Sequence, residues 1–165
     1  MTERIAVFIS STSRDLTQYR DRVTQVVLRM GAYPIIMEAF NSTDRNVLQL
    51  CYDHLQEAQI FIGIYAHRYG YAPGSHLSYT AVDGTVQSGD GETSITHLEY
   101  MWAHQRNLPM LLFVVSDSDV EGEPLIWDQT HIEEGPGQQR LATFKTSLLE
   151  NHVVGFFHSP DHLSA

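Results

Sequence analysis

The sequence predicts an α/β fold, a flavodoxin-like three-layer sandwich with a five-stranded parallel sheet in the order 2-1-3-4-5. Short apolar segments alternate with amphipathic helical ones along the chain, which is typical of βαβ units. Two of the strand-like segments are apolar on both faces, as parallel strands covered by helices on each side are. At 165 residues the chain is about one domain long. We therefore expect one domain over residues 1–165, either alone or as part of a longer chain.

The first part of the chain predicts two strand–helix pairs. IAVFIS, at residues 5–10, is a short apolar run that predicts the first strand. Apolar residues then recur three and four apart over residues 15–31, which predicts an amphipathic helix with Gly31 as its C-cap. YPIIM, at 33–37, predicts the second strand, and residues 46–58 predict the second helix.

The middle of the chain continues the alternation. QIFIGIY, at residues 59–65, predicts a third strand that is apolar on both faces. The polar, glycine-rich stretch 66–92 predicts a mobile loop or a short hairpin. Residues 94–106 predict the third helix, and LPMLLFVV at 108–115 predicts the fourth strand.

The last part of the chain begins with another long polar loop at residues 116–137. QQRLATFKTSLLEN, at 138–151, predicts the fourth helix, and HVVGFF, at 152–157, predicts the final strand. We find no internal repeat, linker or low-complexity segment.

Composition limits the classes of function. Hydrophobic residues make up 42% of the chain and charged ones 18%, which is a globular composition. Twenty acidic against ten basic residues give a formal charge of −10, which disfavours nucleic acid or an anionic membrane as the main partner. A single cysteine, Cys51, fits a reducing compartment. The start of the chain does not read as a signal peptide and no segment is long enough to span a bilayer, so we expect a cytoplasmic location.

Ligands of such sheets bind beyond the carboxyl ends of the strands, at the switch point between strands 1 and 3. The chain delivers polar residues to this place after strand 1, after strand 3 and at the start of the third helix. They are Ser10, Ser11, Thr12, Arg68, Tyr69, Ser94 and Glu99. Hydroxyls and amides between a strand and a helix form a good anion cradle, although Thr12 or Ser13 could instead cap the first helix.

Glu99 has three interpretations. It could complete a capping box with Thr96 as the N-cap, or lie exposed near the positive end of the helix. It could also face the crevice as a nucleophile or as a stabiliser of positive charge on a ribose. Arg68 follows a buried strand directly, and it could clamp a phosphate or pair with Glu99 or Asp15.

Other kinds of site find less support in the sequence. The nine histidines are scattered, and without an H-E-x-x-H or C-x-x-C motif we expect no metal site. The chain also lacks the P-loop, the G-x-G-x-x-G fingerprint and the G-x-S-x-G elbow. A flavodoxin-type FMN site stays open as an alternative, because the loop after strand 1 is rich in hydroxyls and Tyr65, Tyr69 or Tyr71 could stack on a flavin.

Several segments together resemble a known family. They are VFISSTSRDLTQYRDRV, GAYPIIMEAF, AQIFIGIYAHRYGYAP, SITHLEYMWA and LPMLLFVV, which cover most of residues 4–116. They are similar to TIR-like domains of unassigned function found at the N-terminus of STAND-type signalling NTPases. The resemblance implies a flavodoxin-like fold related to TIR domains and to nucleoside deoxyribosyltransferases.

The resemblance also implies a function. Glu99 would be the catalytic carboxylate acting on an N-glycosidic bond, and Ser10, Ser11 and Arg68 would line the nucleotide pocket. The substrate would be NAD or NADP, without a further cofactor or metal, in immune-type signalling such as antiphage defence. Self-association and a C-terminal STAND NTPase module are the partners implied. A non-catalytic self-association module is the first alternative, and an FMN-binding protein is the second.

Overall fold

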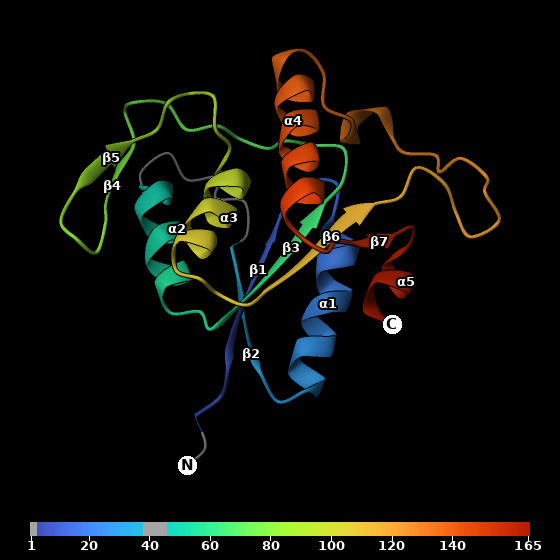
Figure 1. The fold of residues 1–165 in the computed structure, drawn as a ribbon, viewed down its shortest axis with the longest axis horizontal. Helices are drawn as coiled ribbons and strands as arrows, with labels where there is room; N and C mark the ends of the chain where they lie inside the picture. The colour runs from blue at the N-terminus through green and yellow to red at the C-terminus, as the bar shows by residue number, and fades with distance from the viewer. Residues whose placement is uncertain (1–2, 38–45) are drawn as a thin grey trace.

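The computed structural model describes residues 3–37 and 46–165, so the last three residues of the GAYPIIMEAF segment lie outside it. Within these ranges, a five-stranded sheet has the order β2-β1-β3-β6-β7 with every neighbouring pair parallel (Figure 1). The strands are β1 Ala6–Ser11, β2 Tyr33–Ile36, β3 Ile60–Tyr65, β6 Met110–Val115 and β7 Gly155–Phe157. The predicted fold class and strand order are confirmed.

The predicted helices form close to their expected bounds. They are α1 Thr17–Arg29, α2 Val47–Gln56, α3 Ile95–Gln105 and α4 Pro136–Asn151. A 3-10 turn, η1 Gln129–His131, and a short helix, α5 Pro160–Ser164, were not predicted. None of the described helices is both long and apolar enough to cross a lipid bilayer.

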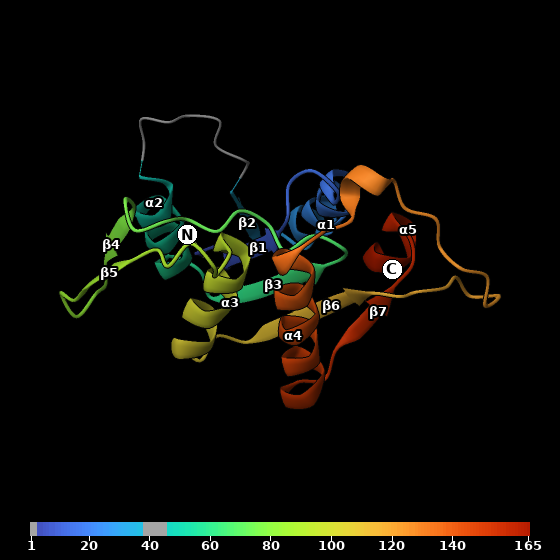
Figure 2. The same ribbon diagram turned by 90° about the horizontal axis from the view of Figure 1, so that it is seen from above.

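The two faces of the sheet are covered by different helices (Figure 2). Phe8 and Phe61 point to one face, where they pack with side chains of α2, α3 and α4. Val7 and Ile9 point to the other face and pack with α1 and with Phe157. This alternation follows from the two-residue period of a strand, and it explains why β1 and β3 are apolar on both sides.

The polar stretch after β3 contains a hairpin. Of the two predicted alternatives, a mobile loop and a short hairpin, the second is therefore confirmed. Strands β4 Ser78–Thr80 and β5 Val86–Ser88 pair antiparallel and project beside α2 (Figure 1). Tyr79 anchors the hairpin: its ring lies 4.8 Å from that of Tyr52, and its hydroxyl accepts a hydrogen bond of 3.0 Å from Nε1 of Trp102. Buried aromatic contacts of this kind hold a short hairpin that would be marginal alone.

Candidate functional site

Glu99 is buried between α3 and the end of β1. Its side chain is only 5% exposed. Ser10 Oγ, at the carboxyl end of β1, donates a hydrogen bond of 2.5 Å to Glu99 Oε2. The N-cap of α3 is Ser94, whose Oγ accepts from the backbone N–H of His97 at 3.2 Å. The capping-box and the exposed interpretations of Glu99 are therefore both wrong, because another residue caps the helix and the carboxyl faces inward.

Burial raises the pKa of Glu99 to about 8, and the hydrogen bond from Ser10 offsets only part of that rise. Within residues 3–37 and 46–165, no Lys or Arg forms an ion pair with Glu99. Its nearest titratable neighbours are acids of higher pKa: a charge on Glu99 raises the pKa values of Tyr65 and Cys51 further. At neutral pH the carboxyl is therefore mostly protonated and surrounded by groups that do not compensate a negative charge.

The loop after β3 packs closely over this end of the sheet. Gly70 has φ +95°, in the left-handed region that glycine adopts readily. A Cβ at this position would lie 3.2 Å from Thr12 Cγ2, 3.5 Å from Thr96 Oγ1 and 3.9 Å from Ser94 Cβ. The β3–α3 loop therefore packs against the β1–α1 loop and the start of α3.

A segment from the distant 116–135 loop is fastened across the β3–α3 loop. Glu133 N–H donates to the carbonyl of His67 at 2.6 Å, and Glu133 Oε2 accepts from the N–H of Tyr69 at 2.8 Å. Arg68 Nη1 donates to the carbonyl of Thr130 at 3.0 Å. We call residues 129–133 the strap. Arg68 thus holds the strap and forms no ion pair with Glu99 or Asp15. Burial raises the pKa of Asp15, and the hydrogen bond from Thr12 and the positive charge of Arg68 offset only part of that rise.

The remaining predicted residues take different positions. Tyr69 is buried, and its hydroxyl hydrogen-bonds to Nδ1 of His97 at 2.8 Å. Ser11 follows Ser10 on the strand, so its side chain points to the α1 face, where its hydroxyl is buried without a hydrogen-bond partner. Of the tyrosines considered for stacking on a flavin, Tyr65 and Tyr69 lie in the core and only Tyr71 is exposed.

The predicted N-caps of α1, Thr12 and Ser13, are wrong, whereas Gly31 ends the helix directly after the C-cap Met30, with φ +77°. Its N-cap is Leu16, and no side chain caps the helix. Thr12 Oγ1 donates to Asp15 Oδ1 at 2.5 Å, and the hydroxyl of Thr17 donates to the carbonyl of Ser13 at 2.8 Å. Local hydrogen bonds within the loop have replaced the cap. Among the residues that the structure describes, no side chain accepts a hydrogen bond from the first N–H groups of α1.

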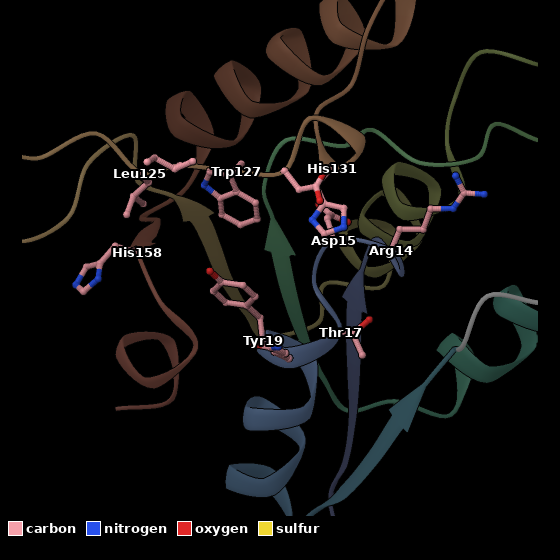
Figure 3. Close-up of a pocket in the computed structure, with 11 residues that line it drawn as sticks. Arg14, Asp15, Thr17, Tyr19, Leu125, Trp127, His131 and His158 are labelled. Atoms are coloured by element: carbon pink, nitrogen blue, oxygen red, sulfur yellow. The ribbon is translucent and has the colours of Figure 1, made fainter.

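Two clefts open at this end of the molecule, on either side of residues 125–127. The first, of about 330 Å³, lies between the start of α1 and the 125–131 segment (Figure 3). The second, of about 350 Å³, lies between the ends of β3 and β6 and the same segment. None of the predicted site residues lines either cleft. The structure brings Ser10 and Glu99 together, but in an enclosed position rather than in an open crevice.

Sequence reasoning named Asp15 as a possible partner of Arg68, but it missed the aromatic residues that line the first cleft. Trp127 and His131 lie in the polar loop, and Tyr19 counted only as a core residue of the first helix. A usable signal was present: Trp127 is the only tryptophan in a long polar segment, where a large aromatic side chain has no obvious strand or helix to pack on.

The comparison with protein families covers almost the whole chain. Residues 6–165 match the family described as "Domain of unknown function (DUF4062)". The chain belongs to this family. It is also similar to the protein named telomerase protein component 1 from Rattus norvegicus, with 28% identity over 91% of the chain, and from Mus musculus, with 29% identity over the same share. The chain spans only 6% of the length of these relatives.

Proposed function

We propose that this domain is a TIR-like effector that cleaves the N-glycosidic bond of NAD, NADP or a related nucleotide in immune-type signalling, such as antiphage defence. Glu99 is the acting carboxylate in this proposal. The observation that carries it is a buried carboxyl group that the fold does not need: Ser94 caps the helix, and the described part of the chain supplies no ion pair to Glu99.

Burial of Glu99 has an energetic cost. Removing an ionisable carboxyl from water costs several kcal/mol unless it is paired or stays neutral. An apolar residue of similar size would fill the same space without that cost. Groups with strongly shifted pKa values are concentrated at functional sites, because they serve the reaction even where they do not stabilise the fold. Glu99 and its Ser10 partner fit this description.

The chemistry suits a carboxyl in this environment. When the C–N bond of a nicotinamide riboside breaks, its electron pair leaves with nicotinamide and positive charge builds on the ribose ring. A cationic group beside Glu99 lowers the pKa of the carboxyl, so that binding of the substrate itself favours the carboxylate. That carboxylate can stabilise the cation or trap it covalently before water completes the hydrolysis, as in glycoside hydrolysis. Neither a metal nor a cofactor is needed for these steps.

Access to Glu99 requires a change of conformation. Glu99 is buried and lines neither cleft, Gly70 packs against Thr12 and Thr96, and the strap is hydrogen-bonded to the same loop. The domain in this form is therefore closed, and an activating event has to move the β3–α3 loop before a nucleotide reaches the carboxyl. Closure of this kind is common in enzymes that exclude water from the reacting bond.

The proposal includes the biological setting that the resemblance implies. It places the domain in the cytoplasm, as the N-terminal part of a signalling protein with a STAND NTPase module. Support comes from the similarity of the chain to one small part of much longer proteins.

The test is release of nicotinamide from NAD and NADP by concentrated protein, beside Glu99→Gln. Glutamine keeps the size and the acceptor for Ser10 but never carries a negative charge, so we expect turnover to fall at least ~10²-fold. Glu57→Gln, an exposed change at the end of α2, is the matched control and should leave the rate unaltered. A Glu99→Gln variant that is as active as the wild type contradicts the proposal.

A non-catalytic self-association module is the second candidate, and one observation favours it. β7 is an edge strand of the sheet, and the apolar side chains beside and on it are open to solvent, with Val153 99% and Phe156 54% exposed. Exposed apolar side chains next to a free strand edge are typical of surfaces that pair with another copy. Self-association without any nicotinamide release would favour this candidate.

A further inference from the structure

The first cleft has the dimensions and the lining of a small-molecule site. Its volume of about 330 Å³ falls in the range of ligand pockets. One wall is aromatic: the rings of Tyr19 and Trp127 lie nearly parallel, at 16° with centroids 5.9 Å apart (Figure 3). Leu125 and Ile126 complete the apolar part of the lining. A planar ring is the ligand shape that such a wall accommodates best.

The cleft also contains a buried acceptor without a donor. Asp15 is only 7% exposed, and Thr12 donates to its Oδ1, but its Oδ2 is buried and has no hydrogen-bond partner within residues 3–37 and 46–165. Buried polar atoms are almost always paired, so an unpaired carboxylate oxygen at the wall of a cleft indicates a missing donor. His131 lies beside Asp15 in Figure 3, and a ligand reaching Oδ2 has to approach past that ring.

The start of α1, which forms another part of the lining, favours a negative charge. Thr17 and Gln18, in the first turn of α1, line the cleft, and that turn has neither a capping side chain nor an acidic residue. The first N–H groups and the positive end of the 13-residue helix attract anions. Arg14, exposed at the rim, adds a full positive charge (Figure 3).

We propose that this cleft binds a nucleoside monophosphate whose base carries an amino group. The base packs on Trp127, its amino group donates to Asp15 Oδ2, and the phosphate lies at the N-terminus of α1 beside Arg14. Each part of the ligand contacts a different feature of the cleft. A simple anion would leave the aromatic wall and Asp15 unused, and a purely apolar ligand would leave Asp15 unsatisfied.

This site is separate from the proposed reaction. Tyr19 and Trp127 belong to the α1 side of the sheet, whereas Ser10 and Glu99 meet on the α3 side. Binding here therefore goes beyond the proposed function, since it needs neither the Glu99 carboxyl nor any turnover.

The experiment is calorimetric titration of the protein with AMP, adenosine and IMP. We expect AMP to bind with a dissociation constant in the millimolar range or below, about 10-fold tighter than adenosine, which lacks the phosphate. IMP has a carbonyl in place of the amino group, so it should also bind about 10-fold more weakly than AMP.

Variants assign each part of the ligand to its residue. Arg14→Ala should reduce the preference for AMP over adenosine, whereas Arg22→Ala removes a charge from the same helix outside the cleft and should not. Asp15→Asn replaces the acceptor by an amide that can donate, so it should shift the preference toward IMP. Asp21→Asn, an exposed change on α1, is its control, and circular dichroism verifies the fold of each variant.

Equal affinities for AMP, adenosine and IMP, or no binding of AMP at millimolar concentration, would overturn this inference. Loss of AMP binding in Glu99→Gln would also overturn it, because the two sites would then not be separate. Absence of nicotinamide release with intact AMP binding would instead count against the proposed function alone.

Discussion

At the scale of single residues, Glu99 shows how a carboxyl can be stable in a protein interior without a cation. It stays mostly neutral at pH 7, because burial raises its pKa to about 8, and Ser10 supplies one hydrogen bond. The neighbouring Tyr65 is also buried and its hydroxyl has no hydrogen-bond partner. A change in the charge of Glu99 therefore alters the stability of this small group of polar side chains inside an apolar core.

Glu99 should make the stability of the protein depend on pH. Its folded pKa, about 8, lies above the ordinary value of 4.5, so its stabilising contribution is complete below pH 4.5 and is lost as the pH rises through 8. Glutamine does not titrate. The free energy of unfolding of Glu99→Gln minus that of the wild type should therefore increase between pH 5 and pH 9 by ~3–5 kcal/mol.

Urea denaturation of both proteins at the two pH values measures this difference, in which the titration of all other groups cancels. An unchanged difference would mean that Glu99 titrates in the folded protein as it does in water, and that the carboxyl is not buried in solution.

The position of Glu99 could be predicted from the sequence, but its surroundings could not. Its place on the helix after the third strand follows from the order of elements. Ser94 and Thr96 are both acceptable N-caps, and a two-residue difference in where the helix starts decides whether Glu99 reaches back to the backbone or turns inward. The contact with Ser10 joins residues 89 positions apart, and no local pattern encodes such a pair.

At the scale of elements, the strap holds the β3–α3 loop. Its main residue is Glu133, which forms hydrogen bonds with both His67 and Tyr69 through its backbone and its side chain. The salt bridge between Arg140 and Glu92, at 3.5 Å, ties the start of α4 to the same β3–α3 connection. The strap and the start of α4 thus hold the β3–α3 loop at two places.

Glu133→Ala should loosen the β3–α3 loop. It removes the acceptor for the N–H of Tyr69, and a partly buried donor left unpaired costs ~1–3 kcal/mol. Hydrogen exchange of the amides at residues 68–70 should accelerate, while those of β1 stay protected. Glu134→Ala, an exposed change one residue further on, is the matched control. Equal exchange in the two variants would show that the side chain of Glu133 does not hold the loop.

The regular elements were predictable because they carry strong periodic patterns. β1 and β3 are continuous apolar runs, and α1 has its apolar residues at helical spacing. The long polar loops carry no such pattern. The strap and the Tyr19–Trp127 wall arise from tertiary contacts between distant segments, so both clefts became visible only in the folded chain.

At the scale of the whole molecule, the two faces of one sheet hold two different arrangements of polar groups. The α3 face encloses Glu99, and the α1 face opens into the cleft beside Trp127. Both lie near the carboxyl ends of the strands, where the helix N-termini also point and where parallel α/β sheets bind their ligands. The fold thus offers two places for ligand chemistry whose occupation can be measured independently.

The net charge should govern how copies of the domain associate. Each copy carries a formal charge of −10, so copies repel one another at low ionic strength. If apolar side chains such as Phe156 form the contact, raising the salt concentration from about 0.05 M to about 0.5 M screens the repulsion and strengthens self-association. Sedimentation velocity at several protein concentrations measures the change.

Phe156→Ser should weaken association, whereas Val82→Ser, an exposed apolar change near the hairpin, should not. Association that weakens with salt would instead indicate that ion pairs hold the copies together.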